Sequence, residues 1–202
     1  MTAGLAGGSD DPPVGIVSEE TLSDNWGRLS RVVFDLRGRD GRVERQTREV
    51  YDRGHGVALL PHDPERGTVL LVRQFRIPAY MAGHNGMLVE ACAGMCDGNT
   101  PEDAIRKEAE EELGLKVRRL TRLFEAFMSP GSVSEKLTFF LADYRPEDRS
   151  APGGGAEGEG EDIEILETTL DEAFAMIGTG EIADAKTIML LQHARLRYLA
   201  GS

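Results

Sequence analysis

The chain has 202 residues, enough for one substantial core with an appendage, and a formal net charge of −12 at pH 7. This acidic balance excludes nucleic acids and anionic membranes as partners, because both are bound through clustered Lys and Arg residues, so a metal ion would have to bring in an anionic substrate. The two cysteines, Cys92 and Cys96, fit neither a disulfide framework nor a C-x-x-C metal site. Because the sequence has no basic and apolar leader and no apolar run of about 18 residues, we expect a soluble, unexported, cytoplasmic protein with reduced cysteines.

The N-terminal quarter of the chain is predicted to be a tail followed by a β arm. Residues 1–15 are rich in Gly and Pro and lack periodicity, which predicts a disordered tail. Residues 29–36 and 43–51 are strand-like and flank the turn at 38–41, which predicts a hairpin. Because a two-stranded ribbon is marginal alone, this arm, assigned to residues 16–54, must lie on the main body or on a partner subunit.

The main domain is assigned to residues 55–202 and is predicted to begin with a second hairpin. Residues 57–60 and 68–73 are apolar runs separated by a turn that contains Pro and Gly. Arg73 and Arg76 lie at the exit of this hairpin. They could be solvated edge charges, or they could form a clamp on a diphosphate.

Residues 101–113 are predicted to form a helix that carries a dense acidic face. Thr100 is a suitable N-cap, Pro101 stands at the first helical position, and Gly114 follows the last turn. An apolar side and an adjacent acidic side are expected, formed by Ile105, Ala109 and Leu113 and by Glu108, Glu111 and Glu112.

The acidic face needs a compensating charge. Carboxylates at i, i+3 and i+4 repel one another, and the C-terminal half of a helix disfavours anions. A divalent cation is the natural compensator, and oxygen ligands without His or Cys thiolate favour Mg²⁺ or Mn²⁺ over zinc. The alternative is a solvated acidic helix face.

The rest of the chain predicts further strands, a long loop and two helices. The loop at residues 145–162 is dense in Gly and carboxylates, and we expect it to be mobile, either as a lid over a metal site or as a solubilising linker. Strands alternating with helices predict an α/β/α sandwich over a mixed sheet. The predicted strands are residues 120–128, 136–144 and 163–166, and the helices are 169–177 and 185–199 with Asp184 as a cap.

The stretch from Gly94 to Leu115, with K-E-x-x-E-E-x-G at residues 107–114, resembles the signature of the Nudix hydrolases. It departs from that signature at Thr100, where the family usually has a Glu, at Lys107, where it usually has an Arg, and in a spacing that is one residue short. Other stretches are similar to the bacterial GDP-mannose pyrophosphatase and ADP-ribose pyrophosphatase branch, namely SDNW at 23–26, REVYDRG at 48–54, VRQFR at 72–76, MSPG at 128–131, GEDIE at 160–164 and TGEIADAKT at 179–187.

This resemblance implies an α/β fold, a Nudix-type α/β/α sandwich with a mixed sheet and an N-terminal β-hairpin arm. It implies Mg²⁺-dependent hydrolysis of a nucleoside diphosphate sugar, GDP-mannose to GMP and mannose 1-phosphate, with Mn²⁺ as a possible substitute. The alternative is ADP-ribose hydrolysis to AMP and ribose 5-phosphate. A third reading, a nucleotide-sensing domain without turnover, rests only on Thr100 and Lys107. The family also implies a homodimer with exchanged N-terminal arms.

The resemblance also implies which residues form the site. The metal would be held by Glu108, Glu112, Glu161 and the main-chain carbonyl of Ala93, and would neutralise phosphoryl charge and activate water. Glu111 would hold position or share a metal, and Glu161, or Glu159 in its place, would accept the proton from water. The substrate would be lined by Trp26, Arg48, Glu49, Arg76, Gly94, Met95, Glu135 and Lys186.

Overall fold

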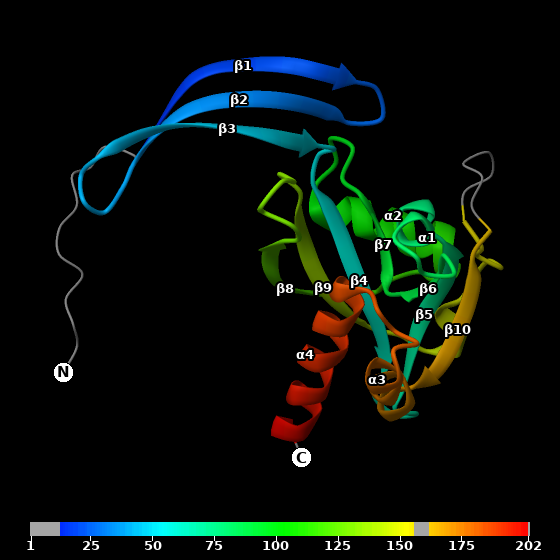
Figure 1. Ribbon diagram of the computed structural model, residues 1–202. Coiled ribbons are helices and arrows are strands. Elements are labelled where there is room, and N and C mark those ends of the chain that lie inside the picture. Colours follow the sequence, from blue (N-terminus) through cyan, green and yellow to red (C-terminus); the bar gives the residue numbers. More distant parts are fainter. Residues whose placement is uncertain (1–12, 156–161, 202) are drawn as a thin grey trace, which may run out of the picture. The chain divides into compact units, whose positions relative to one another are not determined.

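The computed structural model describes residues 13–155 and 162–201. Two compact units divide the chain (Figure 1). The arm unit is Met1–Arg53 with Ser129–Ser134, and the sandwich unit is Gly54–Met128 with Glu135–Ser202.

The arm unit is an antiparallel sheet of three strands in the order β1-β2-β3. The predicted hairpin is present as β2 and β3, but β1 adds a strand and begins inside the predicted tail, so the expectation of a two-stranded arm was wrong. Register shifts between Ile16 and Ser18 and between Thr21 and Ser23 break the alternation by which a strand is recognised in a sequence. The strands are β1 (Val14–Asp24), β2 (Arg28–Arg37) and β3 (Val43–Asp52).

The sandwich unit is built on a mixed sheet of seven strands. The central path is β10-β5-β4-β9-β8; β6 pairs with β5 and β7 with β4, and only the β4–β9 pair is parallel among these. The strands are β4 (Gly56–Asp63), β5 (Thr68–Phe75), β6 (Met87–Glu90), β7 (Cys92–Met95), β8 (Arg119–Phe127), β9 (Lys136–Asp143) and β10 (Glu164–Thr169).

The second predicted hairpin, β4 and β5, is joined only next to its turn. Just two residue pairs link the strands, His62 with Val69 and Asp63 with Thr68. Beyond them the strands diverge, and β6 and β7 take up the backbone groups of β5 and β4. Residues 87–95 therefore run through the middle of the sheet, where the acidic helix can reach them.

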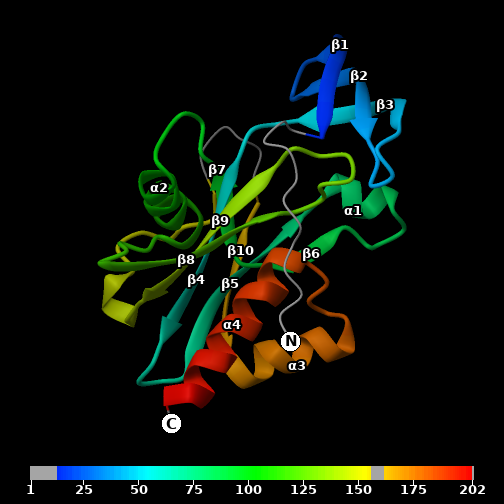
Figure 2. The ribbon, with the colours of Figure 1, turned by 90° about the vertical axis from the view of Figure 1, so that its left-hand side faces the viewer.

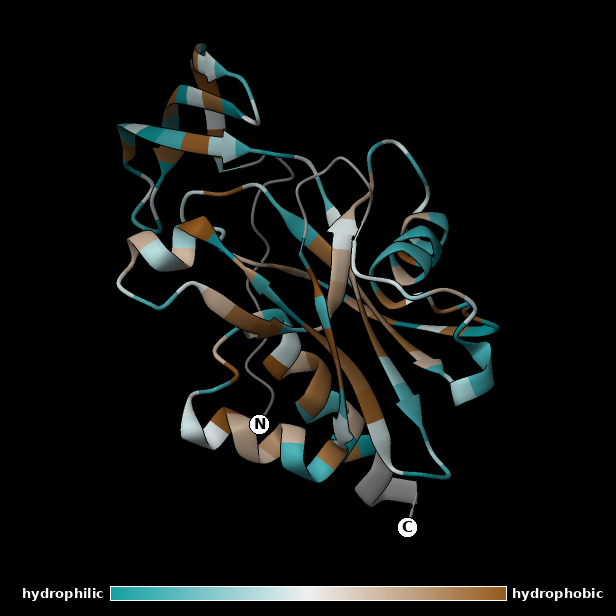
Figure 3. Ribbon diagram, turned by 90° about the vertical axis from the view of Figure 1, so that its right-hand side faces the viewer, coloured by the Kyte–Doolittle hydropathy of each residue, from teal (hydrophilic) through white to brown (hydrophobic). Residues whose placement is uncertain are grey.

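Helices cover both faces of the sheet, which confirms the predicted α/β/α sandwich. Figures 1 and 2 show α2 on one face and α3 with α4 on the other. In Figure 3 the apolar colour concentrates on the central strands, while the outer side of α2 is polar. The helices are α1 (Ile77–Met81), α2 (Pro101–Leu113), the short 3-10 helix η1 (Pro146–Asp148), α3 (Leu170–Thr179) and α4 (Ala185–Gly201).

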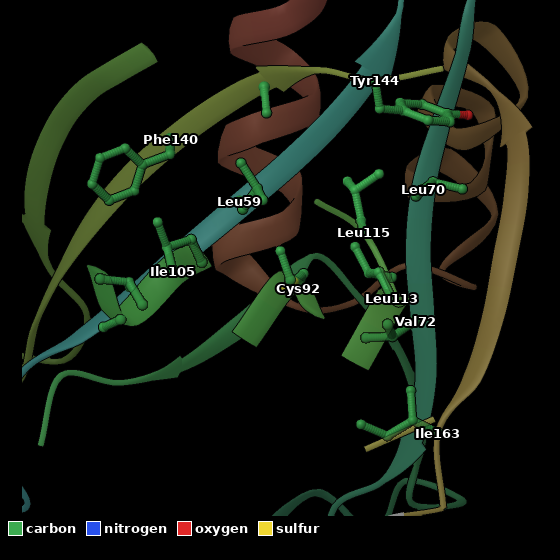
Figure 4. Packing of buried hydrophobic residues seen from close by; sticks show 14 residues of the cluster. Leu59, Leu70, Val72, Cys92, Ile105, Leu113, Leu115, Phe140, Tyr144 and Ile163 are labelled. Atoms are coloured by element: carbon green, nitrogen blue, oxygen red, sulfur yellow. The ribbon is translucent and has the colours of Figure 1, made fainter. Parts of the chain in front are cut away.

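Strand alternation supplies each face with its own core. On β4, Val57 and Leu59 pack in the cluster that includes α2, whereas Ala58 and Leu60 pack in the cluster that includes α3 and α4. On β5, alternate residues likewise belong to the two clusters. Figure 4 shows the α2-side cluster, in which Ile105 and Leu113 lie beside the strands. The predicted apolar side of α2 is thus confirmed as buried.

The described part of the predicted mobile loop is attached to the end of α2. The N–H groups of Ser150, Gly154 and Gly155 donate to the carbonyls of Gly114 (2.8 Å), Glu112 (2.9 Å) and Glu111 (3.1 Å). These are carbonyls that a helix C-terminus leaves without intrahelical partners. Up to residue 155, the loop is therefore joined to α2 by hydrogen bonds, and its mobility stays a prediction. Residues 156–161 lie outside the described residues.

Candidate active site

The acidic helix is fixed at both ends by local chemistry, as predicted. The Thr100 hydroxyl accepts the Asp103 N–H at 3.2 Å and donates to the Asp103 carboxylate at 2.6 Å. Gly114 ends the helix in the left-handed region at φ 64°. Because the buried side of α2 faces the core, its neighbouring acidic side lies along β7.

Two of the three clustered glutamates are held against β7. Glu112 is only 2% exposed, and its Oε2 accepts the N–H of Ala93 at 3.2 Å. The Glu108 carboxylate lies directly on Gly94, because a Cβ placed there would be 2.1 Å from Glu108 Cδ and Oε1. The structure therefore brings Glu108, Glu112, Ala93 and Gly94 together, although they come from two elements.

Glu111 lies farther out. Its side chain is 32% exposed and its Oε2 is 3.0 Å from Lys107 Nζ, one turn back along the helix. Lys107 therefore pairs with a carboxylate of its own helix.

The donor atoms at β7 suit a hard cation. Within residues 13–155 and 162–201, no three His, Cys, Asp or Glu side chains form a group that could hold a metal ion by themselves. A donor set here consequently needs main-chain oxygen or water beside the carboxylates of Glu108 and Glu112. Such an oxygen-only set is the kind that Mg²⁺ and Mn²⁺ prefer.

A second cluster lies at the end of β6, where two predicted substrate residues meet on one carboxylate. Glu90 is 2% exposed, and its Oε2 lies 2.8 Å from Arg76 Nη2 and 3.1 Å from Lys186 Nζ. Burial by itself would raise the pKa of Glu90, but Lys186 and Arg76 outweigh it and lower that pKa below its ordinary value. Glu90 is therefore an anion in the folded protein near neutral pH.

Glu90 was not among the predicted site residues. A signal was present in the sequence, since a carboxylate at the end of the apolar run Leu88-Val89-Glu90 needs a cation if the run is buried. The identity of that cation was not readable, because Lys186 is distant in the sequence.

The two arginines at the exit of β5 take different roles. Arg73 lies 3.0 Å from Glu164 and 3.8 Å from Glu181, both more than half exposed, so it is a surface edge charge. Arg76 instead binds the buried Glu90. Of the two alternatives weighed for this pair, the edge-charge reading therefore holds for Arg73.

The remaining predicted residues are spread over the chain. Gly94 and Met95 lie on β7, and Glu135 is half-buried immediately before β9. Trp26, Arg48 and Glu49 belong to the arm unit, where Trp26 is 88% exposed and the Arg48 guanidinium donates to Thr47 O at 2.8 Å. Glu159 and Glu161 lie outside the described residues. The roles given to all of these residues stay predictions.

Comparisons with known proteins match both parts of the chain. The family model described as NUDIX domain matches residues 52–191, and the one described as GDP-mannose pyrophosphatase NudK N-terminal domain matches residues 13–51. A GDP-mannose pyrophosphatase of Pectobacterium atrosepticum is 53% identical over 186 residues, which cover 92% of this chain and 95% of the relative. A GDP-mannose pyrophosphatase of Salmonella arizonae is 45% identical over 187 residues, which cover 92% of this chain and 97% of the relative.

A solved structure shares the fold. It is described as the crystal structure of ADP compounds hydrolase, and it superposes with a TM-score of 0.74 at 20% identity, covering 96% of this chain and 98% of that chain. None of the helices in the described part of the chain is long and apolar enough to cross a membrane.

Proposed function

The chain belongs to the Nudix hydrolase family, and from this premise we propose that it hydrolyses the diphosphate of GDP-mannose to GMP and mannose 1-phosphate. The observation that carries the proposal is the likeness to GDP-mannose pyrophosphatases at 45–53% identity over more than nine-tenths of both chains, arm included. The arrangement of Glu108 and Glu112 on β7 supports a hydrolytic site in the same chain.

We propose Mg²⁺ as the metal, with Mn²⁺ able to substitute. Glu108, Glu112 and the Ala93 carbonyl would hold it, together with Glu161 from outside the described residues. When bound, the metal would neutralise charge on the phosphoryl oxygens and lower the pKa of water. The Ala93 N–H donates to Glu112 and so fixes the direction of that carboxylate. The proton from water would pass to Glu161 or Glu159, with Glu111 holding position.

Arg76 and Lys186 would supply the cations for the diphosphate. Guanidinium and ammonium groups are the usual protein donors to phosphate oxygens, and both of these side chains meet on Glu90. Trp26, Arg48, Glu49 and Glu135 complete the proposed substrate set, with Gly94 and Met95 from β7. Trp26 offers an indole for stacking on the base, since its side chain is 88% exposed.

We also propose a homodimer with exchanged N-terminal arms. Among the described residues of the arm unit, only Ser30 is buried, while Ile16, Trp26 and Val43 are exposed by 63%, 88% and 58%. A three-stranded sheet without a covered apolar face is marginal in water, so a partner surface would stabilise it. Light scattering should give twice the chain mass of 22.1 kDa, and a monomer with full activity would contradict the proposal.

A cytoplasmic location is proposed from the cysteines. Cys92 lies in the core and Cys96 at its edge, and neither forms a disulfide within the described part of the chain. Reduced thiols are typical of a reducing compartment.

The function is tested by initial rates on GDP-mannose and ADP-ribose at equal concentration with Mg²⁺ or Mn²⁺, and by identification of the products. We expect GMP and mannose 1-phosphate and a clear preference for GDP-mannose. Glu112→Gln should lose activity by about a hundredfold or more, whereas the exposed Glu110→Gln on the same helix should not. Preference for ADP-ribose would refute the substrate, and release of nothing by the wild type would refute catalysis.

A further inference from the structure

The carboxylate of Glu90 lies beneath two cations that reach closer to the surface than it does. Glu90 is 2% exposed, whereas the side chains of Lys186 and Arg76 are 13% and 38% exposed. Both cations bind the same oxygen, Oε2, and Arg76 Nε also donates to Oε1 at 3.2 Å. One buried anion therefore holds an ammonium and a guanidinium side by side.

A set of hydrogen bonds fixes Lys186 from the other side. Asp184 Oδ1 lies 3.0 Å from Lys186 Nζ, and Asp184 Oδ2 accepts from the Thr187 N–H (2.9 Å) and hydroxyl (2.6 Å). The Thr187 hydroxyl in turn accepts the N–H of Ala91 at 2.7 Å, and Thr187 is fully buried. The first turn of α4 is thus attached to the residue between β6 and β7, two residues before Ala93.

Stability alone does not account for this arrangement. A buried ion pair loses the hydration of both charges, and apolar residues of similar volume usually stabilise a core at least as well. A second cation on the same oxygen adds repulsion between like charges, which Glu90 offsets for both cations and Asp184 offsets for Lys186. The cluster therefore keeps two cations close together at the edge of the core, at an energetic cost.

We propose that Glu90 is a positioning residue that holds Arg76 and Lys186 together, so that the two cations bind the two phosphates of the substrate as a pair. The inference rests on the proposed function, because it takes a diphosphate as the ligand. Glu90 does not itself bind the substrate. Without its charge, the two cations lose the anion that they share and separate, so that they no longer act as a pair.

The test compares Glu90→Gln, which keeps the size, with Glu90→Asp, which keeps the charge on a shorter side chain. We expect Glu90→Gln to raise the KM for GDP-mannose about tenfold or more while kcat changes by less than about threefold. The reason is that the two cations bind the substrate equally in the ground state and in the transition state. Glu90→Asp should recover part of the loss. Affinity for Mn²⁺ should stay at the wild-type value in both variants.

The matched control is Asp148→Asn. Asp148 is also a buried carboxylate, 8% exposed, and its Oδ1 lies 2.7 Å from Arg118 Nε. Loss of the Asp148 charge should lower the midpoint of thermal unfolding without changing the KM for GDP-mannose. Equal KM increases in this control and in Glu90→Gln, or an unchanged or lower KM in a folded Glu90→Gln, would overturn the proposal.

Binding of inorganic pyrophosphate without metal separates this inference from the proposed function. Calorimetry should show that the wild type binds it about tenfold more tightly than Glu90→Gln. If the wild type fails to hydrolyse GDP-mannose yet shows this difference, the proposed function fails and the positioning role stands. If the two proteins bind pyrophosphate equally, or neither binds it, the positioning role fails whatever the activity.

Discussion

Gly94 offers the sharpest test of the contact between β7 and α2. Gly94 lies opposite Val57 in the β4–β7 pairing, and its backbone lies outside the left-handed region, so alanine is allowed there. A Cβ at this position would lie 2.1 Å from Cδ and Oε1 of Glu108 and 2.6 Å from its Cγ. The three atoms nearest to the added Cβ of Gly94→Ala therefore all belong to the side chain of Glu108.

The size of the effect follows from these distances. Carbon atoms in contact prefer separations of about 3.5 to 4.0 Å, so the Glu108 carboxylate must retreat by more than about 1 Å. A misplacement of about 1 Å at a reacting centre can cost roughly a hundredfold, which corresponds to about 2.7 kcal/mol of transition-state stabilisation. Stability should change by less than about 1 kcal/mol, because the clashing atoms end a flexible side chain and alanine restricts the unfolded chain more than glycine does.

The assay is kcat/KM on GDP-mannose over a range of Mg²⁺ concentration, with urea unfolding in parallel. Gly178→Ala in α3 is the control, because a Cβ there meets nothing within 4 Å. It should leave activity unchanged and stabilise the protein by about 0.4–1 kcal/mol. Wild-type kcat/KM in Gly94→Ala would refute the placement of Glu108 on Gly94, and a loss of stability as large as the loss of activity would refute a local effect.

Three further predictions concern other parts of the sandwich unit. Gly114→Ala should lower the free energy of unfolding by about 2 kcal/mol or more, because φ at Gly114 is +64° and a Cβ there would lie 2.0 Å from the Ala151 carbonyl oxygen. Urea unfolding measures this, and an unchanged midpoint would contradict the attachment of residues 150–155 to α2. His62 Nε2 is buried without a partner among the described residues, and burial lowers the pKa of His62 below its ordinary value. The folded state therefore resists protonation, stability should fall as pH drops below about 6.5, and His62→Leu should flatten that slope in urea titrations at several pH values. Lys107→Ala removes an exposed i,i+4 ion pair with Glu111, and a pair of this type contributes about 0.3–0.5 kcal/mol. We therefore expect kcat/KM to change by only about twofold. A hundredfold loss would show instead that Lys107 acts on the substrate.

What could be predicted from the sequence was the structure that nearby residues determine. The helix of residues 101–113 has its cap, its first-turn proline and its terminal glycine within the same short stretch, and the structure has it at the predicted bounds. The apolar side of that helix follows from spacing alone. Both are local, and neither depends on how the sheet is ordered.

What was missed depends on pairing between distant strands. β1 was missed because two register shifts disrupt its alternation. β7 was missed because it is a strand of only four residues, which pairs with β4 where β4 and β5 diverge. The contact of Glu90 with Lys186 follows from placing the start of α4 against the end of β6. Periodicity within a short window carries no information about that placement.

The two residues that differ from the Nudix signature, Thr100 and Lys107, both make contacts within α2. Thr100 caps α2 by a reciprocal pair of bonds with Asp103, so its hydroxyl contributes to fixing the helix that presents Glu108 and Glu112. Lys107 holds the outer carboxylate Glu111, and neither departure removes Glu112 from Ala93 or Glu108 from Gly94. The loss of one of these carboxylates from β7 would have favoured a sensing domain without turnover. Because both remain in place, the altered residues affect how the helix is fixed and leave the carboxylates that it places along β7 unchanged.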